Sequence, residues 1–193
     1  LLPALEKALC DVSEKVRTHA ASAFGKLTKV AGLLPAEQVV NSLVKKIGTN
    51  SLTSASTDGK GERTADNQAS RALRGLKEIL RAKPRDVLDF LIPLAMRSPV
   101  DLRNALLLET ACAAAGTALV HYLPKILHTV VKELKVLSAS ENSGELSAVD
   151  ATAIRDALQR SVQCTMQALS ADGLETCLYE IQIELVNEMS APN

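Results

Sequence analysis

The clearest chemical signal in the sequence is a group of basic side chains on and just after one predicted helix, residues 65–83. The group consists of Arg71, Arg74, Lys77, Arg81 and Arg85. The arginines fall on or near one helical face, opposite the apolar stripe, and Glu78 is the only acid between Arg71 and Arg85. A guanidinium group suits phosphate because its planar fork donates two hydrogen bonds at once. This face predicts contact with RNA phosphates or an acidic protein tail, and the plainer interpretation is a solvated or ion-paired helix face.

Residues that could form a catalytic or metal site lack the spacing that such sites need. The candidates are His19, His121, His128, Cys10, Cys112, Cys164 and Cys177. His121 and His128 are two helical turns apart, too far to bind one ion, and no His-Glu-x-x-His or Cys-x-x-Cys spacing occurs. We therefore predict no catalytic residue, no metal, no cofactor and no small-molecule substrate. The cysteines are expected to be small buried hydrophobes in a reducing compartment.

Composition favours a helical protein. Of the 193 residues 47% are hydrophobic but only 2% are aromatic, and Trp is absent, so the core must be built from Leu, Ala, Val and Ile. The sequence has no apolar run long enough to indicate a membrane span. The zero net charge conceals an asymmetry, because residues 1–100 hold 16 Lys and Arg against 10 Asp and Glu, whereas residues 101–193 hold 6 against 12. Such a charge difference can orient a partner.

A repeated pattern places the basic helix in a stack of helical pairs. Leu-Pro or Ile-Pro recurs at residues 2–3, 34–35, 92–93 and 123–124, each time in an apolar helix-like segment, and amphipathic stretches follow. Neither helix of a pair can bury its apolar face alone, so stacking must complete the core. We predict an all-α fold, an α-α superhelix of helical hairpins forming one array over 1–193. Its pairs are approximately 1–32, 33–83, 84–116, 117–170 and an incomplete 171–193.

Turn and loop signals separate these helices. Asp11 is predicted to open the second helix and Gly32 to end it, while Ser98 is predicted to cap the helix that Gly116 ends. The polar segments 48–63 and 138–145 are predicted to be loops. The apolar face of the second helix is expected to include Val16, Ala20, Ala23, Phe24, Leu27 and Val30.

The second helix carries the pattern of a known repeat. Its residues Asp11, Val16, Arg17, Ala20, Ala21, Ala23 and Gly25 resemble the HEAT repeat consensus. In that family an Asp at the turn and an Arg on the second helix pair within and between repeats as a ladder. The resemblance implies this role for Asp11 and Arg17. Arg103 has the matching place in a later repeat, but Asp101 is too close in sequence to be its ladder acid.

Several segments are similar to a narrower group within the HEAT family. These are 8–17, 75–79, 87–93, 98–103 and 114–119, which resemble the C-terminal third of the large general-control translational activators. The similarity extends over roughly residues 1–135. It implies a ribosome-binding scaffold that activates the kinase of the initiation factor 2 α subunit. The partners implied are the ribosome, that kinase and other proteins, with ribosomal RNA as the phosphate source.

From these observations we expect a non-catalytic scaffold segment, not an enzyme, located in the cytoplasm. The chain starts without Met, and we expect it to be a piece of a longer protein. The alternative is another HEAT adaptor, such as a nuclear transport receptor, whose partner would be a small GTPase or a signal peptide. An engineered repeat and a helical enzyme are less favoured, because the loops are irregular and no active-site pattern exists.

Overall fold

The computed structural model of the protein describes residues 1–48, 62–143 and 148–171, and within these ranges every regular element is a helix. The elements in chain order are α1 (Leu2–Leu9), α2 (Glu14–Ala31), α3 (Leu33–Gly48), α4 (Glu62–Ala82), α5 (Pro84–Ala95), α6 (Leu102–Ala114), the 3-10 helix η1 (Gly116–Tyr122), α7 (Leu123–Ser143) and α8 (Ala148–Ala171). Most of the predicted 48–63 loop and most of the predicted fifth pair lie outside the described residues.

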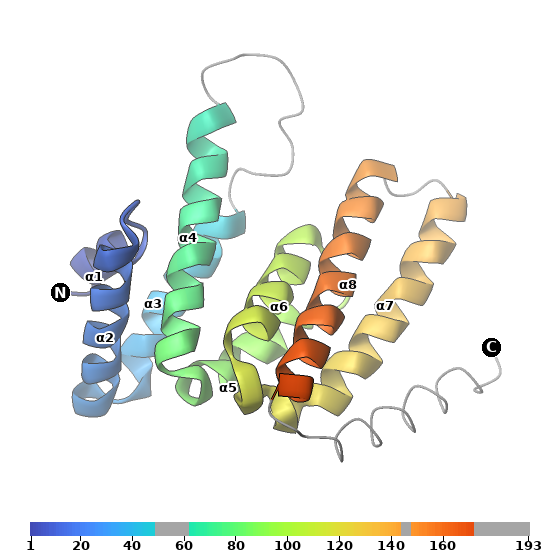
Figure 1. Ribbon diagram of the computed structural model, residues 1–193. Helices are drawn as coiled ribbons and strands as arrows, with labels where there is room; N and C mark the ends of the chain where they lie inside the picture. The colour runs from blue at the N-terminus through green and yellow to red at the C-terminus, as the bar shows by residue number, and fades with distance from the viewer. Residues whose placement is uncertain (49–61, 144–147, 172–193) are drawn as a thin grey trace. The chain divides into compact units, whose positions relative to one another are not determined.

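The chain divides into two compact units, Leu1–Leu91 and Ile92–Asn193. In the first unit α1 packs against α2 and α3 packs against α4, so each predicted hairpin is present. The hairpins stack through α2 against α4 and α1 against α3, as the ribbons of this unit show (Figure 1). Each of α1, α2, α3 and α4 contacts the other three, so these four helices form one packed group.

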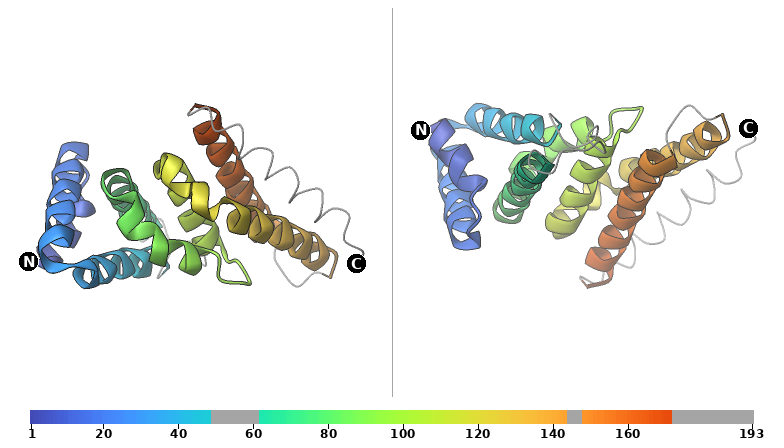
Figure 2. Two further views of the ribbon diagram at one scale, coloured as in Figure 1. Left: turned by 90° about the horizontal axis from the view of Figure 1, so that it is seen from below. Right: turned by 90° about the horizontal axis from the view of Figure 1, so that it is seen from above.

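In the second unit α8 is the central helix. It packs extensively against α6 and also against α7 and η1 (Figure 2). The 3-10 turn and α7 together occupy the place of the first helix of a hairpin, and α8 is the second helix. The all-α fold of HEAT-type hairpins is therefore confirmed in each unit, while one continuous array over 1–193 remains a prediction.

Two glycines end helices where the sequence predicted it. Gly32 follows α2 with φ 79°, and Gly116 follows the end of α6 with φ 53°. Both values lie in the left-handed region, which a Cβ atom disfavours and glycine enters without cost.

Other helix ends differ from the prediction. Helix α6 is capped by Asp101, whose Oδ1 accepts the Asn104 N–H at 2.7 Å, and not by Ser98. Between them Val100 donates its N–H to Glu133 Oε2 at 3.2 Å, which holds Val100 outside the helix. Helix α7 continues to Ser143, so residues 138–143 are helical and not a loop. Ser138 bonds back to the Leu134 carbonyl at 2.9 Å, which satisfies its hydroxyl within a helix.

The core confirms the apolar stripe predicted opposite the basic residues of α4, but the face of α2 is rotated. The buried residues of α2 are Arg17, Ala20, Ala21, Phe24, Gly25 and Thr28. Val16 is 41% exposed, Val30 is 89% exposed and Ala23 is exposed too, contrary to the prediction. Burying the Arg17 guanidinium against the preceding turn brings Ala21 and Thr28 inward, and Val16 and Val30 face outward in consequence.

Candidate interaction surface

The predicted basic residues lie on the solvent side of the first unit. One face of α4 is buried through Ala69, Ala72, Leu76, Ile79 and Leu80. The opposite face carries three exposed arginines and a half-buried lysine, and an exposed arginine follows on α5. These are Arg71, Arg74, Arg81, Lys77 and Arg85. The amphipathic pattern of α4 thus positions the basic group as the spacing indicated, and its contact with phosphate remains a prediction.

One of these arginines is partly neutralised by an acid on its own helix. Arg81 Nη1 lies 3.0 Å from Glu78 Oε1, and the side chains are 51% and 11% exposed. Of the two plainer interpretations of the basic face, solvated or ion-paired, the second therefore applies to Arg81. Exposed pairs of this kind contribute about 0.5 kcal/mol to stability, so the contact leaves Arg81 available to a stronger anion.

A pocket between α2 and α4 adds basic residues that the sequence did not bring together. It has a volume of about 450 Å³ and is lined by Thr18, Ala21, Ser22, Gly25, Lys26, Lys29, Glu78, Arg81, Ala82 and Lys83. Lys26 and Lys29 come from α2, and Arg81 and Lys83 come from the end of α4 and the residue after it. Lys26 and Lys29 belong to the first hairpin and Arg81 to the second, so only the stacking of α2 on α4 brings them together.

A second pocket, between α1, α3 and α4, includes Arg71 but has mixed charge. Its lining includes Glu6, Lys7, Asp11 and Lys46 beside Arg71. Glu6 Oε2 accepts hydrogen bonds from Ser42 Oγ at 2.6 Å and from Lys46 Nζ at 3.2 Å. The acids offset most of the basic charge, so this pocket is a weaker anion site than the pocket between α2 and α4.

The predicted ladder residues make different contacts from those that the HEAT pattern implies. Arg17 Nη1 donates to the main-chain carbonyls of Asp11 at 2.9 Å and Val12 at 2.8 Å. The Asp11 carboxylate instead accepts the Ser13 N–H at 2.8 Å. No ion pair between Arg17 and the Asp11 carboxylate occurs among the described residues, and both groups bond to the main chain of the turn instead.

Arg103 contacts an acid of its own turn, and a ladder role for Arg103 remains a prediction. Arg103 Nη2 lies 3.6 Å from Asp101 Oδ2. Asp101 therefore contacts the arginine while its other oxygen caps α6.

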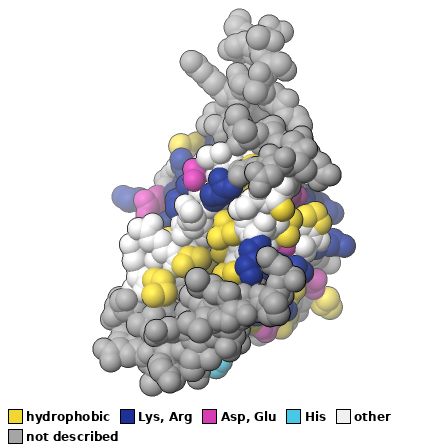
Figure 3. All heavy atoms as spheres, turned by 90° about the vertical axis from the view of Figure 1, so that its right-hand side faces the viewer, with side chains coloured by type: hydrophobic (Ala, Val, Ile, Leu, Met, Phe, Trp, Pro, Cys, Tyr) yellow, Lys and Arg dark blue, Asp and Glu magenta, His cyan; other side chains and the backbone are white. Residues whose placement is uncertain are grey.

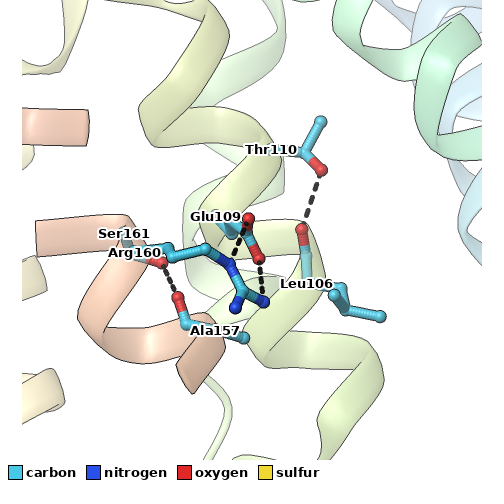
Figure 4. Close-up of polar contacts among 6 residues, drawn as sticks. All are labelled: Leu106, Glu109, Thr110, Ala157, Arg160 and Ser161. Atoms are coloured by element: carbon cyan, nitrogen blue, oxygen red, sulfur yellow. Dashed lines mark hydrogen bonds and ion pairs between the residues drawn. The ribbon is translucent and has the colours of Figure 1, made fainter. Parts of the chain in front are cut away.

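Ion pairs between successive hairpins do occur, at positions that the sequence analysis missed. Glu109 on α6 and Arg160 on α8 form a bidentate pair, with Nε to Oε1 at 2.8 Å and Nη2 to Oε2 at 3.1 Å (Figure 4). The hydrogen bond to Glu109 raises the pKa of Arg160 further above its usual value. In the first unit an ion pair between Glu6 Oε2 and Lys46 Nζ, at 3.2 Å, links α1 to α3. These acids and bases are 40 or more residues apart, so no local spacing indicates them.

The remaining candidates are the residues considered for a metal site and the cysteines. No group of three or more His, Cys, Asp or Glu residues there could hold a metal ion. Cys10, Cys112 and Cys164 are free thiols, Cys112 is buried, and Cys177 lies outside the described residues. In the same ranges no helix has both the length and the apolar content that crossing a bilayer requires.

Apolar side chains are exposed as well as basic ones. On the face drawn in Figure 3, hydrophobic side chains gather between groups of Lys and Arg. In the first hairpin Val12 is 67% exposed and Val30 is 89% exposed. Surfaces of this kind in repeat proteins are covered by a neighbouring repeat or by a protein partner.

Comparison with known proteins agrees with the helical-hairpin architecture. The family described as "Stalled ribosome sensor GCN1-like, HEAT repeats" matches residues 87–191, and the HEAT repeat family matches residues 1–31. The first match extends well beyond residue 135, where the similarity noted from individual segments ended. No solved structure matches the chain significantly.

Individual relatives cover most of this chain but little of their own length. The stalled ribosome sensor GCN1 of Mus musculus and that of Homo sapiens are each 33% identical over 136 residues, which is 70% of this chain and 4% of each relative. The eIF-2-alpha kinase activator GCN1 of Dictyostelium discoideum is 25% identical over 142 residues, 74% of this chain and 5% of that protein. The chain therefore corresponds to a small part of these relatives.

Proposed function

Because the chain belongs to the family of stalled ribosome sensor GCN1-like HEAT-repeat proteins, we propose that it is a scaffold segment that couples stalled or collided ribosomes to activation of the initiation factor 2 α kinase. The observation that carries this proposal is the family match over residues 87–191, more than half of the chain. The names of the relatives, a ribosome sensor and a kinase activator, supply the two partners.

The mechanism proposed is geometric. Stacked hairpins present long rows of side chains on both helices of each pair, and such surfaces bind large partners. A scaffold that holds the ribosome and the kinase together raises their effective concentration without any new contact between them. The basic face of α4 is the surface that we assign to the ribosome, with ribosomal RNA as the phosphate source.

The coupling role is tested by replacing this segment within a full-length protein. The replacement should be an unrelated HEAT array with the same number of hairpins, so that the length of the scaffold is preserved. We expect phosphorylation of the initiation factor 2 α subunit during amino-acid starvation to fall markedly. Unchanged phosphorylation at equal expression would show that the segment has no specific part in the coupling.

The scaffold is proposed to be non-catalytic and cytoplasmic. The purified chain should show no nucleotide hydrolysis or group transfer above a buffer control, and robust turnover would contradict this. In cell fractionation the full-length protein should follow cytoplasmic ribosomes, and its accumulation in another compartment would argue against the assignment.

A further inference from the structure

We propose that the pocket between α2 and α4 binds the phosphodiester backbone of duplex RNA. The inference rests on the proposed function, since a ribosome is the source of such RNA, but it concerns a site that no family resemblance identifies.

The pocket has a strong excess of positive charge. Lys26, Lys29, Arg81 and Lys83 line it against a single acid, Glu78. None of the three lysine side chains has a hydrogen bond or ion pair to another residue in the described part of the chain. Three unpaired ammonium groups around one concave surface attract a polyanion, and binding releases counterions from its phosphates.

Small side chains line the pocket together with the basic ones. They belong to Ala21, Ser22, Gly25 and Ala82. A Cβ atom built on Gly25 would come within 3.3 Å of Lys83 Cε, so the aliphatic part of Lys83 lies across this glycine. The backbone of a nucleic-acid strand can therefore approach α2 and α4 closely, with the lysine ammonium groups beside it.

The residue types favour an RNA backbone over unpaired bases or an acidic peptide. No aromatic side chain lines the pocket, so bases have nothing on which to stack. Planar, bidentate recognition of a carboxylate uses arginine, and three of the four basic residues that line this pocket are lysines. Lysines act as point charges that bind phosphate without a fixed geometry, which suits recognition of duplex RNA through its backbone.

The test is fluorescence anisotropy of a labelled RNA duplex of about 16 base pairs, measured against the whole 193-residue chain over a salt series. The pocket variant combines Lys26→Gln, Lys29→Gln and Lys83→Gln. The matched control combines Lys45→Gln, Lys125→Gln and Lys132→Gln, which are exposed lysines outside both pockets and remove the same charge. Circular dichroism verifies that both variants fold.

We expect the pocket variant to weaken binding by about ten-fold or more and to flatten the salt dependence by about two to three in log–log slope. The control should change the affinity by no more than about three-fold. Equal losses in the two variants would overturn the pocket assignment. Competition by a polyglutamate peptide as effective as that by unlabelled duplex would overturn the choice of RNA. If ribosome binding persists while duplex binding is unaffected by the pocket variant, this inference fails and the proposed function stands.

Discussion

At the scale of single residues, a buried carboxylate holds the turn before α6. Glu133 on α7 is 3% exposed, and its Oε2 accepts the Val100 N–H at 3.2 Å. Its other oxygen is buried without a hydrogen-bond partner among the described residues. Val100 is itself buried, so its N–H has no route to water if the carboxylate is removed.

Replacing this carboxylate should therefore destabilise the second unit. We expect Glu133→Ala to lower the free energy of unfolding by about 2 kcal/mol or more, because it leaves a buried N–H unpaired and a void. Glu133→Gln keeps an acceptor for Val100 and should lose less than half as much. Urea unfolding measures both values, and an alanine variant as stable as the wild type would show that the bond has no net effect.

The buried thiol of Cys112 gives a prediction about pH. Burial raises its pKa from the ordinary 9.0 to about 11, although the hydrogen bond with Thr165 acts in the opposite direction. A pKa raised in the folded state gives stability that is complete below pH 9 and lost as the pH rises towards 11, because the unfolded thiol ionises first.

The wild type should therefore lose about 1 kcal/mol more than Cys112→Ala between about pH 8 and about pH 10. Urea unfolding under reducing conditions at the two pH values measures the difference. The alanine variant corrects for other groups that titrate in this range, such as lysines and tyrosines. Parallel losses in the two proteins would mean that the thiol ionises equally in both states.

At the scale of elements, the crossing of α1 and α4 depends on one glycine. A Cβ atom at Gly75 would lie 2.5 Å from the Leu9 carbonyl oxygen and 3.0 Å from its carbon. These are main-chain atoms at the end of α1, so they cannot move aside as a flexible side chain would. Glycine costs about 1 kcal/mol in a helix relative to alanine, and here the close approach of the helices offsets that cost.

Gly75→Ala should accordingly destabilise the first unit by about 1–3 kcal/mol, despite the higher helix propensity of alanine. Gly25→Ala is the matched control, because its Cβ would meet only the side chain of Lys83 at 3.3 Å. The control should be neutral or slightly stabilising in thermal unfolding. A Gly75 variant as stable as the Gly25 variant would contradict the tight crossing.

Helix ends and contacts between helices differ in how well the sequence predicts them. Gly32 and Gly116 ended helices as predicted, because a left-handed residue is a local requirement. The cap of α6 was misassigned because Ser98 and Asp101 are both good caps, and Glu133, 33 residues away from Val100, decides between them. The pocket lysines Lys26 and Lys29 were missed for the same reason, since only helix stacking brings them beside α4.

At the scale of the whole molecule, charge follows the division into two units. Residues 1–91 hold 15 Lys and Arg against 10 Asp and Glu, whereas residues 92–193 hold 7 against 12. The basic face of α4 and the pocket between α2 and α4 both belong to the first unit. We therefore expect the first unit to supply the contact with ribosomal RNA, and the acidic second unit to meet proteins.

The most direct test of the ribosome-scaffold assignment is sedimentation of the chain with purified ribosomes over a salt series. The comparison is a folded variant with Arg71→Glu, Arg74→Glu, Arg81→Glu and Arg85→Glu. We predict that the wild type sediments with ribosomes at low salt, that salt weakens this binding, and that the variant loses it. Failure of the folded wild type to sediment with ribosomes even at low salt would contradict the assignment.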